Sequence, residues 1–322
     1  MHLGKVRDTW NSGSDQELMQ GLRCLSLVYL SLVCFPAFLA LGQNLSEDRI
    51  REARALLSQG RLTEAKQAAV DSLETNQQSA DAHFLLGYIL FKQQNAKASL
   101  AEYTEGAKYR KPTATELQVV AGDYVLLSDY PDADRWFSKA LDWNPDDALG
   151  WYYLGRVKYN ENRFEEALSA FGRCLALAPR NVKAEDNLGL AFQGLGRNAE
   201  AIAAYRKALE WQADSAAKDS GPYLDLGSLL MDDGRAPEGL PLLIEAARIS
   251  PADFRMHRQL GKAYMRLGQL ENAQAELAKA IELAPNDAPL HFMLSQVYHR
   301  RGMRDQAKAE TDRYSALAKD KQ

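Results

Sequence analysis

Cysteine is scarce in this chain, and its distribution excludes a disulfide framework for most of the sequence. Only three of the 322 residues are cysteines, and two of them, Cys24 and Cys34, lie in an apolar stretch near the N-terminus. Cys174 is therefore alone in the rest of the chain, where no internal disulfide can form. The fold of that part must depend on side-chain packing.

The sequence also has no strong charge imbalance and no recognisable catalytic motif. Its 39 basic and 43 acidic residues give a net charge of −4, so no bulk attraction to nucleic acid is expected. We find no glycine-rich phosphate loop, nucleophile elbow or metalloprotease helix. We therefore expect a protein that is not an enzyme, has no cofactor or bound metal, and does not bind nucleic acid.

The N-terminus contains an apolar segment, residues 22–41, which is typical of an export signal. A basic residue, Arg23, precedes the apolar core, Pro36 interrupts it, and small residues come just before Gln43. We predict a signal peptide over residues 1–42, with Met19 as an alternative translation start.

This segment has a second interpretation. Residues 22–41 form a longer apolar run than most signal cores, so an uncleaved membrane anchor is the alternative. The sequence thus predicts an exported protein, periplasmic or secreted, or one anchored to the membrane by this segment.

The rest of the chain has a period of 34 residues. Pro145 and Pro179 are 34 residues apart, as are Pro251 and Pro285. Small residues recur in the same phase, with a single longer step of 38 residues: Ala53, Gly87, Ala121, Gly155, Gly189, Gly227, Gly261 and Ser295. The longer step indicates an insertion of four residues within residues 212–222, either a tolerated surface loop or a hinge.

These columns resemble the tetratricopeptide repeat, in which W-x2-L-G-x2-Y is followed by A-x3-F and then proline. One repeat carries the pattern in the following residues: Trp151, Leu154, Gly155, Ala167, Phe171 and Pro179. We predict a repeat domain over residues 43–322 with eight copies: 46–79, 80–113, 114–147, 148–181, 182–215, 220–253, 254–287 and 288–321. The resemblance implies an all-α solenoid of helix-turn-helix repeats, wound into a right-handed superhelix whose first helices line a concave groove.

The periodicity has a physical basis as well. In each copy, apolar residues at steps of three and four make one helix face, and a second such face follows after a polar turn. The glycine or alanine column lets two helix backbones approach closely, and a large residue sixteen positions later fills the space beside it. One helix pair cannot bury its apolar stripe, so neighbouring copies must stack.

Aromatic and polar residues outside the core columns are the candidate binding residues. They share one helix face in the second copy and one in the fourth: Phe84, Tyr88, Phe91, Tyr152, Arg156, Tyr159 and Asn160. Recognition surfaces are enriched in aromatic residues and arginine. The alternative is that these side chains pack against the adjacent repeat.

A basic face in the last two copies is the second candidate: Arg255, Arg258, Lys262, Arg266, His299 and Arg300. Like charges at helical spacing disfavour a helix, so they require a partner. That partner is either internal, namely acidic residues of the preceding copy, or an anionic ligand such as an acidic peptide.

The sequence therefore predicts a non-catalytic scaffold outside the cytoplasm that holds a peptide or protein partner, perhaps an acidic one, in its groove. Two alternatives use the same array. It would serve either as a membrane-anchored assembly factor of the cell envelope or as the accessory subunit of an envelope enzyme.

Overall fold

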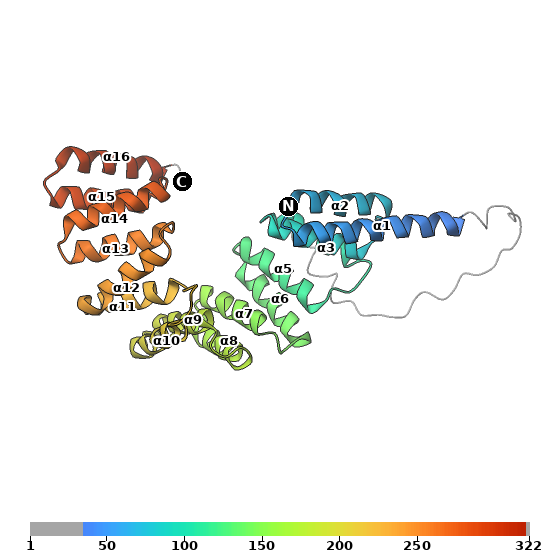
Figure 1. The fold of residues 1–322 in the computed structure, drawn as a ribbon, viewed down its shortest axis with the longest axis horizontal. Coiled ribbons are helices and arrows are strands. Elements are labelled where there is room, and N and C mark those ends of the chain that lie inside the picture. Colours follow the sequence, from blue (N-terminus) through green and yellow to red (C-terminus); the bar gives the residue numbers. More distant parts are fainter. Residues whose placement is uncertain (1–34, 320–322) are drawn as a thin grey trace, which may run out of the picture. The chain divides into compact units, whose positions relative to one another are not determined.

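The computed structural model describes residues 35–319, which consist of α-helices joined by turns and short loops (Figure 1). Consecutive helices pair as helix-turn-helix units, so the predicted all-α fold of about eight repeats is confirmed. The sixteen helices of this part are α1 (Phe35–Ser58), α2 (Leu62–Thr75), α3 (Ala80–Lys92), α4 (Ala96–Gly106), α5 (Ala114–Leu126), α6 (Tyr130–Trp143), α7 (Ala148–Asn160), α8 (Phe164–Leu177), α9 (Val182–Gly194), α10 (Asn198–Trp211), α11 (Gly221–Asp232), α12 (Ala236–Ile249), α13 (Phe254–Arg266), α14 (Leu270–Leu283), α15 (Ala288–Arg300) and α16 (Arg304–Lys319).

The helices belong to two compact units. The first ends at Pro145 and contains α1 to α6, and the second begins at Asp146 and contains α7 to α16. Within each unit a first helix packs on its own second helix, and that second helix packs on the first helix of the next pair. Each pair thus buries its apolar face against two neighbours, as a stacked repeat requires.

The predicted leader lies mostly outside the described residues, which begin at residue 35. Helix α1 starts at Phe35, well before the expected first repeat near Ser46, and continues through the predicted cleavage point ahead of Gln43. Within residues 35–319, no helix is both long enough and apolar enough to cross a membrane.

Turn and cap residues explain where the helices begin and end. The side chain of Asp147 accepts hydrogen bonds from the backbone of Leu149 and Gly150 at 3.0 and 3.1 Å, which starts α7. In five copies the turn between the two helices contains a glycine at positive φ, for example Gly196 at 72°. Asn162 takes the same conformation at 60° in the fourth copy, a role that asparagine tolerates better than most residues.

Close helix contacts follow the small-residue column. A Cβ placed on Gly155 would lie 2.6 Å from the ring of Phe171, and one on Gly189 would lie 2.5 Å from the ring of Tyr205. Both rings are fully buried. Each glycine therefore leaves room for the large residue sixteen positions later, which fixes the distance between the two helices of a repeat.

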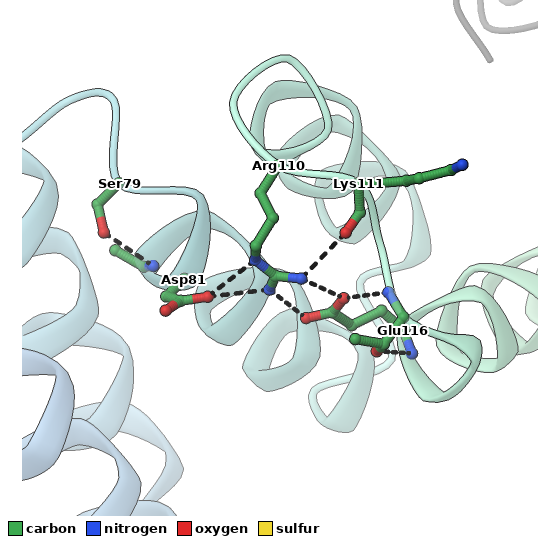
Figure 2. A network of polar contacts seen from close by, with 7 residues as sticks. Ser79, Asp81, Arg110, Lys111 and Glu116 are labelled. Carbon is green, nitrogen blue, oxygen red and sulfur yellow. Dashed lines mark hydrogen bonds and ion pairs between the residues drawn. The ribbon is translucent and has the colours of Figure 1, made fainter.

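Polar contacts join two repeats of the first unit around Arg110 (Figure 2). Its Nη2 atom lies 2.9 Å from Oδ1 of Asp81 on α3 and 2.7 Å from Oε1 of Glu116 on α5. Glu116 also accepts from the backbone N–H of Thr113 at 2.7 Å, as one half of the capping box of α5. The guanidinium thus bridges the starts of two successive first helices.

Candidate functional site

The face of α7 brings together the candidate residues of the fourth copy. Tyr152 is half-buried, with its ring centroid 6.1 Å from that of Phe171, and the guanidinium of Arg156 lies 5.9 Å from the Tyr152 ring. Tyr159 is also half-buried and meets Phe164 edge-on at 5.5 Å. Both tyrosines therefore pack on the core through one side while part of each ring remains accessible.

Burial raises the pKa of both tyrosines. For Tyr152 the nearby Arg156 opposes this shift, whereas for Tyr159 the negative charge of Asp225 adds to it. These hydroxyls remain neutral and can donate hydrogen bonds. Arg156 and Asn160 are exposed on the same helix, so this face offers two anchored aromatic rings, a cation and an amide.

The candidate residues of the second copy do not form such a face. Phe84 is only 3% exposed, its ring lies 5.6 Å from that of Tyr103, and a Cβ on Gly106 would come within 2.8 Å of it. The structure therefore places Phe84 in the core of the helix pair rather than on a binding surface. Sequence analysis could not foresee this, because Gly106 opens the space that the ring occupies.

Phe91 and Tyr88 lie differently on the same helix. A Cβ on Gly122 of α5 would come within 2.9 Å of the Phe91 ring, so Phe91 packs against the next repeat. Tyr88 is half-buried, 6.5 Å from Phe91, and Lys92 lies 5.6 Å from its ring. Of these three aromatic residues, Tyr88 contacts the fewest core groups.

The basic face of α13 is partly neutralised by acidic neighbours. Arg266 forms an ion pair with Asp232 of α11, which is the internal pairing between repeats that we considered as the alternative. Arg255 pairs with Asp253, the N-cap of its own helix, with Nε 3.0 Å from both carboxylate oxygens.

Two basic residues of α13 keep their charge uncompensated. Arg258 stacks on Phe254 at 5.6 Å, and Lys262 borders a shallow depression together with Ser228 and Gln259. Neither forms an ion pair within residues 35–319.

The basic residues of α15 are exposed. Arg300 donates a hydrogen bond to the backbone carbonyl of Met265 at 2.8 Å and so caps the end of α13. His299 lies next to Arg300 on the same helix. The basic face therefore consists of a mostly paired edge and two free cations, Arg258 and Lys262.

Sequence analysis missed a cluster of carboxyl groups in the fifth and sixth copies. Asp186 of α9 occupies the same column as Tyr152, yet it is 6% exposed and its Oδ1 atom has no hydrogen-bond partner in the described part. Burial and the nearby Asp225 and Asp219 raise the pKa of Asp186 to about 9. The column position was the available signal, but the burial of Asp186 could not be read from it.

Within residues 35–319, no group of three or more histidine, cysteine, aspartate or glutamate side chains is arranged to hold a metal ion. Three of the histidines instead occupy equivalent packing positions. His83, His257 and His291 each face a glutamate of the following helix through Nδ1 and a backbone carbonyl through Nε2.

Comparison with known proteins identifies relatives for separate parts of the chain. The peroxisomal targeting signal receptor of Kluyveromyces lactis is 41% identical over 115 residues, which are 35% of this chain and 20% of that receptor. The mouse protein O-mannosyl-transferase TMTC3 is 28% identical over 145 residues, 42% of this chain and 15% of that protein. The chain thus matches a fifth or less of the length of either relative.

Solved structures agree on the fold. A tetratricopeptide repeat protein from Parabacteroides merdae has a TM-score of 0.67 and 17% identity, and the match covers 79% of this chain and 99% of that one. Sequence models described as tetratricopeptide repeats match residues 50–114, 148–181, 186–215 and 230–291. Together with the helix pairs and the small-residue column, these matches show that the chain belongs to the tetratricopeptide repeat family.

Proposed function

We propose that this chain is an exported, non-catalytic scaffold that binds a peptide or protein partner through the first helices of its repeats. The face of α7 carries the proposal. Tyr152 and Tyr159 are held on the core by Phe171 and Phe164, so binding need not immobilise two flexible side chains. Arg156 and Asn160 beside them are exposed and free to select a polar or acidic partner.

Two further observations support a binding role. Several relatives are named peroxisomal targeting signal receptors, that is, proteins that bind another protein's targeting signal. On α13, Arg258 and Lys262 remain available to an acidic partner, whereas Arg266 and Arg255 are paired internally. We therefore propose that acidic partner groups contact α13 at Arg258 and Lys262.

Partner capture from an extract of the producing cells tests the α7 face. Arg156→Glu changes the charge of an exposed side chain, so it should reduce capture of the partner without disturbing the fold. Lys279→Glu on α14 is the matched control, since Lys279 is also exposed and lies on a second helix. A Tyr152→Ala/Tyr159→Ala variant should abolish capture. Partner sets identical to wild type for both α7 variants would refute the proposal.

Export has a separate test. The proposal rests on the apolar segment of residues 22–41, and it predicts that the exported protein begins at Gln43. The intact mass of the protein recovered from outside the cytoplasm checks this directly. A full-length protein recovered with the membrane fraction would favour the anchored alternative instead.

A further inference from the structure

Three carboxyl groups from different parts of the second unit meet at the start of α11. Asp186 belongs to α9, Asp219 to the loop before α11, and Asp225 to α11 itself. A Cβ placed on Gly221 would lie 2.8 Å from Oδ2 of Asp186 and 3.2 Å from Oδ1 of Asp219. Two carboxylates therefore flank a backbone position that has no side chain.

The four-residue insertion fixes one of these carboxylates in place. Gln212 is 3% exposed, and its side-chain amide donates to the carbonyl of Asp219 at 3.0 Å and accepts from the Asp219 backbone N–H at 2.7 Å. The side chain of Asp219 in turn accepts from the backbone N–H of Gly221 at 2.9 Å. The inserted loop is therefore an ordered element that delivers Asp219 to the cluster.

The cluster has no internal counter-ion. The groups that act on it electrostatically are Tyr152 and Tyr159 from α7, Tyr205 from α10, and Arg255 from α13. Arg255 is the only cation among them, and its guanidinium is bound by Asp253. Tyr205 donates its hydroxyl hydrogen to Gln193 at 3.0 Å. The Oδ1 atom of Asp186 is thus left without a partner in the described part of the chain.

An uncompensated buried carboxyl lowers the stability of the fold, since an unpaired charge or polar group loses its hydration there. Burial is the main reason why the pKa of Asp186 rises to about 9 and that of Asp225 to about 7. An external cation would remove this cost. Half-buried tyrosine rings beside the carboxyls suit such a ligand, because aromatic faces also attract cations.

We propose that Asp186, Asp219 and Asp225 form a binding site for the ammonium group of a lysine side chain of the partner, in the space next to Gly221. The proposal rests on the proposed function in that the lysine belongs to a bound peptide or protein. A lysine ammonium is compact and carries three donors, so it can bridge carboxylates that approach from two helices and a loop.

The test uses the whole chain and a free probe, Nα-acetyl-lysine N-methylamide, followed by amide chemical shifts in NMR. Saturable shifts are expected at Gly221 and Asp225. The Nε-acetylated probe, which has no charge, should produce none. Equal shifts from the two probes would overturn the proposal, and this comparison needs no variant.

Two substitutions examine the same site, and one serves as a control. Asp186→Asn and Gly221→Ala should each abolish the shifts, the first by removing charge and the second by filling the space. Asp232→Asn changes an exposed aspartate of α11 outside the cluster and should leave binding unchanged. Circular dichroism confirms that each variant is folded. Unaltered binding in folded Asp186→Asn protein would refute the assignment.

Protons compete with the cation for the same oxygens, so binding must weaken as the pH falls. Because the raised pKa values lie near 7 and 9, affinity for the probe should drop about tenfold between pH 8 and pH 6. Affinity that is independent of pH would contradict the site. Because the probe is a free amino-acid derivative, failure here with normal partner capture would overturn this inference alone, whereas loss of capture would affect only the proposed function.

Discussion

The imidazole of His83 lies between two acceptors, with Nδ1 2.7 Å from Oε2 of Glu102 and Nε2 3.0 Å from the carbonyl oxygen of Gln77. A neutral imidazole has one N–H and can satisfy only one of these contacts as a donor, whereas the imidazolium can satisfy both. The hydrogen bond to Glu102 is the largest cause that raises the pKa of His83, burial opposes it, and the bond to Gln77 adds to it.

This arrangement predicts a stability that depends on pH. The folded pKa of His83 is above its unfolded value, so its contribution is fully present below about pH 6.5 and is lost as the pH rises through the folded value. The free energy of unfolding should fall across that window. Glu102→Gln should reduce this dependence and lower the His83 pKa measured by NMR. Glu74→Gln, at an exposed position of α2, is the control. An unchanged His83 titration in Glu102→Gln protein would contradict the prediction.

Asp123 gives the first unit a dependence on pH of a different origin. Its side chain is fully buried, neither oxygen has a hydrogen-bond partner in the described part, and burial raises its pKa to about 7 against the opposing effect of Ser99. The folded protein keeps the carboxyl neutral while the unfolded chain ionises it. Stability is therefore lost as the pH rises from about 4 to about 7.

Replacing this carboxyl by an amide removes the ionisation. Relative to wild type, Asp123→Asn should gain unfolding free energy between pH 5 and pH 8, by on the order of 2 kcal/mol. Urea unfolding at the two pH values measures the difference. Asp142→Asn on the exposed side of α6 should show no such gain. A constant offset between Asp123→Asn and wild type at both pH values would show that Asp123 is ionised in the folded state.

Much of the fold could be predicted because the repeat sets it locally. The glycine column and the aromatic residue sixteen positions later specify one contact per helix pair, and Gly155 with Phe171 shows that contact directly. The site was harder to predict, since it depends on what lies opposite each residue. Phe84 occupies a groove column but turns into the space left by Gly106, which lies on the other helix of the pair.

Asp186 illustrates the same limit for charged residues. Its burial follows from the inserted loop, which is held by the contacts between Gln212 and Asp219. A loop conformation of this kind has no periodic signal, so neither the burial of Asp186 nor its missing partner could be read from the sequence.

Pro241 lies inside α12, which continues through it from Ala236 to Ile249. Its ring removes one backbone hydrogen bond and crowds the preceding turn. Pro241→Ala should therefore raise the unfolding free energy by about 1–3 kcal/mol and slow hydrogen exchange over residues 238–248. Pro237, in the first turn of the same helix, is the matched control, and Pro237→Ala should change stability by less than about 0.5 kcal/mol. Similar effects of the two substitutions would show that Pro241 is accommodated without cost.

Gly155 and Gly172 allow close packing to be separated from helix propensity, since both lie within helices of the same repeat. A Cβ on Gly155 would lie 2.6 Å from the fully buried ring of Phe171, whereas a Cβ on Gly172 would meet no atom within 4 Å. Gly155→Ala should therefore lower the unfolding free energy by about 1–3 kcal/mol through overpacking. Gly172→Ala should raise it by about 0.5–1 kcal/mol, because alanine restricts the unfolded chain more than glycine does. Chemical denaturation of both variants checks the two signs, and stabilisation by Gly155→Ala would show that Phe171 can move aside and that the glycine column does not set the spacing of the helices.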